Sequence, residues 1–183
     1  TNALRRHGVA STWEQLLVPV LNSIGERYAR CGDCIDVEHL FTDCVRTALS
    51  AILLRRRRWS SYPPVLLACL EQEQHTLPLH ALAATLAEFG CSSRILGASV
   101  PADTLVSAVR RINPRAVFVW AQVEPTARFA DLQLLPSQRP PAPVVVGGPG
   151  WQGQDLPSFV TRVDSLTAAV HAVCRDIDVP PPP

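Results

Sequence analysis

The sequence predicts an α/β protein in which a small helical bundle precedes an open, five-stranded parallel sheet. In the first 58 residues, apolar side chains recur every three or four positions, which is the period of an amphipathic helix. From Tyr62 onward, short apolar runs bounded by turn residues alternate with helical patterns. Five strand–helix units in succession are typical of a parallel sheet with right-handed crossovers.

Two helical stretches are predicted before the sheet. The first carries an apolar stripe from Trp13 to Tyr28, and Pro19 either breaks it into two shorter helices or opens the second one. The second is a long helix that begins at Asp36, whose carboxylate can cap the first-turn amides. It ends in the four arginines of residues 55–58, where positive charge suits the helix dipole.

The period change also predicts the order of elements in the second half. Strands are expected at residues 65–70, 93–97, 116–122, 144–147 and 159–163, and helices at residues 77–89, 102–112, 126–135 and 166–177. We therefore expect a helical cap of residues 1–60, an α/β domain of residues 61–178 and a Pro-rich linker of residues 179–183.

Composition narrows the class of protein. The formal net charge of +1 argues against a dedicated nucleic-acid binder, which would normally be strongly basic. Neither an apolar run of membrane-spanning length nor a signal peptide is visible, so we expect a cytoplasmic protein with mostly free, buried cysteines. The pair Cys31 and Cys34 has zinc-like spacing but lacks a second pair. With no methionine and a terminal run of prolines, we expect a fragment of a longer protein.

The segment Glu73-Gln74-His75 is the strongest candidate for a site. It follows the first predicted strand, and open parallel sheets bind ligands at the carboxyl ends of their strands. Taken alone, His75 would be interpreted first as a surface histidine in a polar loop. Two further signals lie at fixed distances: Tyr28 is followed after nine residues by Glu38-His39, and a late apolar run ends in Gly147-Gly148.

Together these signals resemble the cobalamin-binding module of light-sensing regulators of the CarH/LitR type, over residues 10 to 178. The resemblance implies a Rossmann/flavodoxin-like sheet that binds cobalamin. It also implies that His75 is the lower axial ligand of cobalt and that Glu73 orients its imidazole. Pro78 stands where the family has glycine, and proline suits the first turn of a helix.

The resemblance gives roles to residues at two further strand ends. Trp120 replaces a family serine beside the nucleotide tail of the cofactor, and Gln122 could supply a replacement hydrogen bond. Gly147 and Gly148 would line the same channel, because paired glycines let backbone approach a ligand without Cβ interference. A core tryptophan at Trp120 and a plain strand-end turn at the glycines are the alternatives.

The helical half would cover the upper face of the cofactor, where the adenosyl group lies. Tyr28 replaces a family tryptophan there, and Glu38 and His39 would contact the adenosyl group. A solvated first helical turn is the alternative for Glu38 and His39. The family histidine that can capture cobalt after illumination corresponds to Ala29, so that residue cannot form a bis-histidine product here.

We therefore expect an adenosylcobalamin-binding photoreceptor domain, not an enzyme, that relays light to an output domain or partner outside these residues. Photocobilins are similar modules that also hold a linear tetrapyrrole, so biliverdin is a candidate second chromophore. Exposed apolar surface on the helices favours self-association, most simply a homodimer, with neither nucleic-acid nor membrane contact. A corrinoid methyl carrier and an interaction domain that has lost its cofactor are the alternatives.

Overall fold

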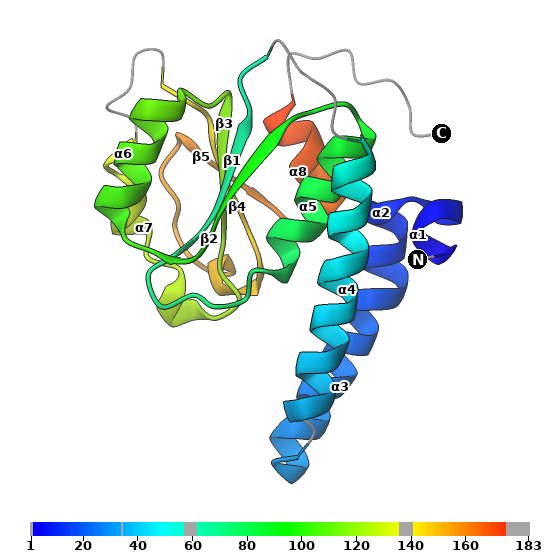
Figure 1. Ribbon diagram of the computed structural model, residues 1–183. Helices are drawn as coiled ribbons and strands as arrows, with labels where there is room; N and C mark the ends of the chain where they lie inside the picture. The colour runs from blue at the N-terminus through cyan, green and yellow to red at the C-terminus, as the bar shows by residue number, and fades with distance from the viewer. Residues whose placement is uncertain (1, 34, 57–61, 136–140, 175–183) are drawn as a thin grey trace.

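Helices fill the first part of the chain and a parallel sheet the second, in a computed structural model that describes residues 2–33, 35–56, 62–135 and 141–174 (Figure 1). The helices before the sheet are α1 (Asn2–His7), α2 (Val9–Thr12), α3 (Val18–Cys31) and α4 (Ile35–Arg56). The strands are β1 (Val65–Leu70), β2 (Ser93–Val100), β3 (Ala116–Trp120), β4 (Val144–Gly147) and β5 (Val160–Val163). Between and after them lie α5 (Leu77–Glu88), α6 (Ala102–Ile112), α7 (Phe129–Leu132) and α8 (Leu166–Val173).

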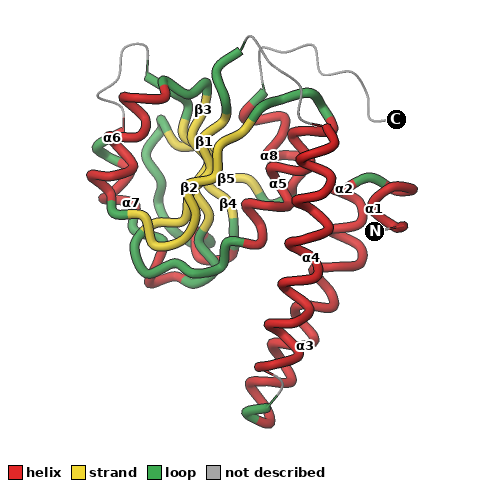
Figure 2. The backbone as a smooth tube through the Cα atoms, viewed as in Figure 1, coloured by secondary structure: helices red, strands yellow, loops and turns green. Residues whose placement is uncertain are grey.

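The five strands form one sheet in the interior of the second part (Figure 2). All neighbouring strands are parallel, and their order is β2-β1-β3-β4-β5. All six residues of β1 are buried, because helices cover both faces of a doubly wound sheet. Alternate residues therefore join different cores: Val65 and Leu67 pack with α5 and α8, whereas Leu66 and Ala68 pack with α6 and α7. The order reverses between β1 and β3, which is the switch point where such sheets bind ligands.

The first helices form a continuous path that ends in a projecting hairpin. One π-helical turn, Trp13–Leu17, joins α2 to α3, and Pro19 lies in the first turn of α3. Proline lacks the amide that a regular helix would donate to the carbonyl four residues earlier, which accounts for the wider turn just before it. Helices α3 and α4 then run side by side away from the sheet, so the part nearest the sheet can cover its edge (Figure 1).

Two carboxylates hold the helices against the α/β domain. An oxygen of Glu88, at the end of α5, accepts the Val9 amide at the start of α2, at 3.0 Å. An oxygen of Glu14, in the π-helical turn, accepts the Leu166 amide at the start of α8, also at 3.0 Å. Both contacts place negative charge at a helix N-terminus, which favours it electrostatically.

The predicted fold class is confirmed, and the predictions for β1, β4 and α6 match the observed bounds. The division into cap, α/β domain and linker stays a prediction, with residues 57–61 and 175–183 outside the described residues. Strand β2 continues to Val100, beyond its expected end at residue 97, and β3 ends at Trp120, before its expected end at residue 122. Two further local predictions were wrong. Asp36 lies inside the first turn of α4, one residue after its start at Ile35. The helix expected at residues 126–135 is replaced by a 3-10 turn, Glu124–Thr126, and the short α7.

Candidate functional site

A tight turn after β1 carries Glu73 into the interior of the protein. Gln72 adopts a left-handed conformation with φ of 70°, and its amide donates to the Ser99 hydroxyl at 3.0 Å. The Glu73 amide donates back to the Leu70 carbonyl at 3.0 Å, and the Glu73 carbonyl accepts the Ser99 amide at 2.9 Å. The loop is therefore tied to the end of β2 before it reaches His75.

The Glu73 carboxylate is only 1% exposed and receives hydrogen bonds from three segments of the chain. Its Oε1 accepts the His75 amide at 2.8 Å and lies 2.5 Å from Nδ1 of the His75 ring. Its Oε2 accepts the Gln122 amide at 2.7 Å and the Thr126 hydroxyl at 2.6 Å. The Thr126 hydroxyl also lies 2.8 Å from the Val123 carbonyl, but an ionised carboxylate is the stronger acceptor.

These contacts keep the buried carboxylate ionised. Burial alone would raise the pKa of Glu73, but hydrogen bonds from the Thr126 hydroxyl, the His75 and Gln122 amides and the His75 ring outweigh it. The pKa of Glu73 therefore lies below its ordinary value of 4.5. A negative charge at this point selects the form of His75 that carries a proton on Nδ1.

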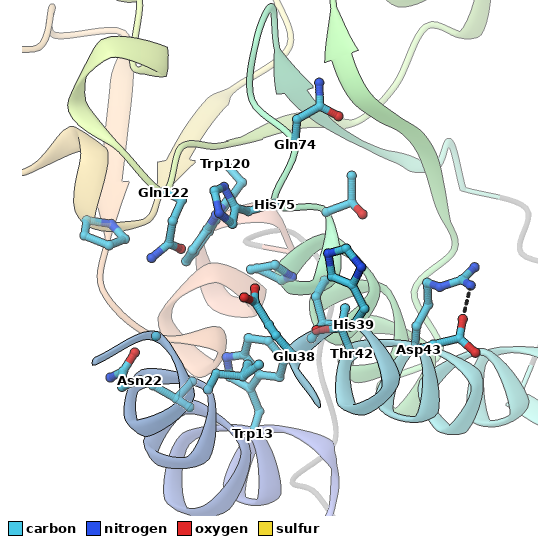
Figure 3. Close-up of a pocket in the computed structure, with 18 of the residues that line it drawn as sticks. Trp13, Asn22, Glu38, His39, Thr42, Asp43, Gln74, His75, Trp120 and Gln122 are labelled. Atoms are coloured by element: carbon cyan, nitrogen blue, oxygen red, sulfur yellow. Dashed lines mark hydrogen bonds and ion pairs between the residues drawn. The ribbon is translucent and has the colours of Figure 1, made fainter. Parts of the chain in front are cut away.

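The His75 ring lies at the edge of a cavity of about 890 Å³ between the sheet and the helical hairpin (Figure 3). This volume is near the upper end of the roughly 300–1,000 Å³ found for small-molecule sites. The His75 side chain is 52% exposed, and Nδ1 is engaged by Glu73, so Nε2 is the nitrogen left for a ligand. A histidine whose second nitrogen is held by a carboxylate is the arrangement that metal-binding histidines use.

The wall of the cavity opposite His75 is polar and comes from α3 and α4. Glu38 and His39, both predicted at the site, point into the cavity together with Asn22 and Thr42 (Figure 3). Glu26, Asp43 and Arg46 complete this side, and Asp43 pairs with Arg46. Tyr28 does not line the cavity: its side chain is 44% exposed, and the cavity is lined by α3 residues at least two positions before it. Its predicted role over the upper face stays a prediction.

The wall on the sheet side contains Pro78, Trp120 and Gln122. Pro78 is buried in the first turn of α5, as its sequence position suggested. Trp120 is the last residue of β3, and its indole Nε1 is buried without a hydrogen-bond partner among the described residues. The Gln122 side chain lines the cavity while its backbone amide holds Glu73.

Gly147 and Gly148 lie next to Trp120 but outside the cavity lining. A Cβ atom on Gly147 would come within 2.8 Å of the Phe118 ring, and one on Gly148 within 3.0 Å of the Trp120 ring and 2.2 Å of the Ala121 carbonyl oxygen. Gly148 also has a φ of +107°, which disfavours other residues. Close packing against Phe118, Trp120 and Ala121 therefore leaves no room for a side chain at either glycine.

Sequence reasoning missed two contributors to the site. Thr126 binds Glu73 from a 3-10 turn that the sequence pattern placed inside a longer helix. Trp13 is buried and lines the cavity from the π-helical turn, although its place in an apolar stripe predicted only core packing. A hydroxyl residue shortly after a strand that neighbours β1 is the signal that could have identified Thr126.

Comparisons with known proteins agree with this geometry. The sequence model of the B12 binding domain family matches residues 63–162, which is more than half of the chain. The HTH-type transcriptional repressor CarH of Myxococcus xanthus is 32% identical over 143 residues, covering 74% of this chain and 46% of the repressor. The similarity therefore extends beyond the sheet, while the chain spans about half the length of that relative.

Two solved structures share the fold at low sequence identity. A cobalamin-binding protein from Desulfitobacterium hafniense is 17% identical, with a TM-score of 0.50 over 86% of this chain and 78% of the other. The methanol:cobalamin methyltransferase complex MtaBC from Methanosarcina barkeri is also 17% identical, with a TM-score of 0.53 over 97% of this chain and 73% of the other. The resemblance of the sequence motifs to a cobalamin-binding module is confirmed at the level of the fold.

We predict that Glu73→Gln lowers the free energy of unfolding at pH 7 by about 2 kcal/mol, because donors that face a buried charge lose their acceptor. A folded-state pKa below the ordinary value makes this contribution complete above about pH 5 and lost as the pH falls through the folded-state value. Urea unfolding at pH 7, 5 and 4 should show the difference between wild type and variant shrinking as the pH falls. Exposed Glu71→Gln is the control, and a difference that grows on acidification would contradict the assignment.

Proposed function

The chain belongs to the B12-binding domain family, and we propose that it is a light-sensing domain that binds adenosylcobalamin through His75. The observation that carries the proposal is the Glu73–His75 pair at the edge of the large cavity, with ring Nε2 left for cobalt. When bound, the cofactor would supply visible absorption and a weak cobalt–carbon bond. The protein would supply the lower ligand, the enclosure and the element that moves.

Glu73 and its hydrogen-bond donors would fix the tautomer and the orientation of His75, the proposed lower ligand. The carboxylate keeps the proton on Nδ1, so Nε2 presents its lone pair. Thr126 and the Gln122 amide hold the other carboxylate oxygen, which prevents the Glu73 side chain from rotating away. The ligand is thus fixed by the segment after β3 as well as by its own loop.

The polar wall formed by α3 and α4 supports an adenosyl group rather than a methyl group. Asn22, Glu26, Glu38 and His39 together offer donors and acceptors that match ribose hydroxyls and an adenine edge. A methyl group could use none of them, and carboxylates facing it would gain no partner in return. A role as a methyl carrier is therefore the less favoured function. The light experiment described below distinguishes it from a sensor.

The α3–α4 hairpin is the element suited to relay a change in the cavity. It contributes Glu38 and His39 to one wall, whereas His75 lies in the loop after β1. None of the side chains of α3 is buried, so few packing contacts oppose movement of this helix. The π-helical turn that precedes it, Trp13–Leu17, gives it an irregular joint. Loss of an upper group would release the hairpin from the sheet side.

The proposal also includes self-association of the domain and a separate domain or partner that receives the light signal. Val37 and Leu40 on α4 are 47% and 68% exposed, and Leu54 is 70% exposed, which supports a dimer formed through the hairpin. The output would reside in a further domain or a partner. A linear tetrapyrrole such as biliverdin is the candidate second chromophore. None of the described helices has the length and apolar character that crossing a bilayer requires.

We expect His75→Ala to remove the spectral signature of histidine ligation and to weaken adenosylcobalamin binding by at least about tenfold. The control is His171→Ala on α8, whose side chain is exposed and lies outside the cavity lining. Visible spectra recorded in the dark after desalting would check both. An unchanged His75→Ala spectrum would refute the ligand assignment.

Thr126→Val should weaken cobalamin binding by about tenfold while the domain stays folded, because Glu73 loses a donor but His75 remains. Thr126→Ser keeps the hydroxyl and should bind within about threefold of wild type. Equilibrium titration followed by absorbance measures both. Equal affinities for the valine and serine variants would show that the hydroxyl does not support the ligand.

Light sensing itself predicts that illumination converts the spectrum of the adenosylcobalamin complex and changes its sedimentation coefficient.

The double variant Glu38→Gln with His39→Ala should bind adenosylcobalamin about tenfold more weakly than wild type, yet bind methylcobalamin within about threefold of wild type. The same samples with biliverdin would reveal an added red band if a second chromophore binds. Preferred binding of methylcobalamin, with methyl transfer to a thiol, would contradict the sensor and identify a methyl carrier.

A further inference from the structure

The fate of the nucleotide tail of cobalamin follows from the lower ligand. In free cobalamin the base of this tail occupies the lower face of the cobalt. If His75 takes that face, as in the proposed function on which this inference rests, the base must leave the metal. A buried tail would then need nucleotide-sized space on the His75 side of the sheet, beside the ends of β1, β3 and β4.

Side chains of the protein fill that region. Phe118 and Trp120 project from the face of β3 that packs against α5 and α8, and Trp120 lines the same cavity as His75. Phe118 is 2% exposed and Leu77, at the start of α5, is 7% exposed. The Cys69 thiol lies 3.7 Å from the His75 carbonyl, so the layer directly beneath the ligand loop is also occupied.

The paired glycines show how closely the end of β4 packs against Trp120, whose ring also lines the cavity. The Trp120 ring lies 3.6 Å from the place of a Gly147 Cβ and 3.0 Å from that of a Gly148 Cβ. A side chain at either position would displace the Phe118 or Trp120 ring or the Ala121 backbone. The glycines at the end of β4 thus give room to an indole and a phenyl ring of this chain, where the sequence resemblance expected a channel for the tail.

We propose that this domain recognises the corrin ring and its upper group but not the nucleotide tail, and that Trp120 is the residue that excludes the tail. The tail would remain outside the sheet, facing solvent at the mouth of the cavity. The ligand class is then corrinoids in general, including those with other lower bases and those without a nucleotide. Cobinamide, which has no base to displace, should bind at least as tightly as cobalamin.

The test is the ratio of two dissociation constants measured on the same chain, with aquocobalamin and diaquocobinamide as probes in spectrophotometric titrations. For wild type, we expect cobinamide to bind as tightly as cobalamin or more tightly. Cobalamin with a bulky group on the ribose 5′-hydroxyl of its tail should bind within about threefold of unmodified cobalamin. A preference of about tenfold or more for unmodified cobalamin over cobinamide would overturn the proposal.

Variants at Trp120 locate the cause. Trp120→Ser should shift the ratio toward cobalamin by about tenfold, because removal of the ring opens space for the tail. Trp120→Phe keeps a large ring and should leave the ratio within about threefold of wild type, which separates bulk from the indole N–H. The ratio of dissociation constants measured on wild type tests the proposal by itself. The proposal can therefore be refuted even if the Trp120→Ser variant fails to fold.

Failure of this inference and failure of the proposed function look different. If both corrinoids pass unbound through a desalting column, cobalamin binding itself fails and the inference falls with it. If cobalamin binds with histidine ligation and cobinamide does not, the proposed function stands and the excluded tail is wrong. If cobalamin and cobinamide bind equally tightly, and His75→Ala abolishes the binding of each, the result supports the proposed function and the excluded tail together.

Discussion

The buried carboxylate of Glu73 is the interaction on which the site depends. It is the meeting point of the loop after β1, the loop after β3 and the 3-10 turn that ends in Thr126. An ionised group that is 1% exposed would be strongly unfavourable without such partners. Each donor therefore has a large effect on how the loop folds, and together they hold one imidazole nitrogen and leave the other available.

The segment after β3 contacts the same carboxylate from a loop and a short turn, where the sequence pattern predicted a longer helix. The short 3-10 turn Glu124–Thr126 brings the Thr126 hydroxyl within 2.6 Å of Glu73. Close approach of the two neighbouring loops also needs glycine. A Cβ atom on Gly150 would lie 2.5 Å from the Val123 carbonyl oxygen, so the turn after β4 can pack against the loop after β3 only without one.

Much of the fold could be predicted because its signals are local. The six apolar residues of β1 and the apolar run of β4 indicate strands buried on both faces, and α6 shows a clean helical period. The position of His75 after β1 followed from the same reasoning. The apolar periodicity that predicted these elements did not identify Thr126, because its partner Glu73 lies 53 residues away in the sequence.

The helical side of the site shows the same limit. Glu38 and His39 reach the cavity and Tyr28 does not, although one spacing motif contains all three. Which turn of α3 faces the sheet depends on how far the hairpin projects, and the spacing along the chain does not contain that information. Likewise, Gly147 and Gly148 indicate that some atom comes close, but only packing shows that Phe118, Trp120 and Ala121 supply it.

Electron paramagnetic resonance of cob(II)alamin bound to protein labelled with ¹⁵N in histidine tests the central claim most directly. Unpaired density on cobalt couples to the nitrogen on its axis, so the splitting reports which nitrogen is bound. If His75 is the lower ligand, the axial splitting should change from a triplet in unlabelled protein to a doublet in labelled protein. A triplet in both samples would mean that cobalt keeps its own base, and the role assigned to Glu73 and His75 would be wrong.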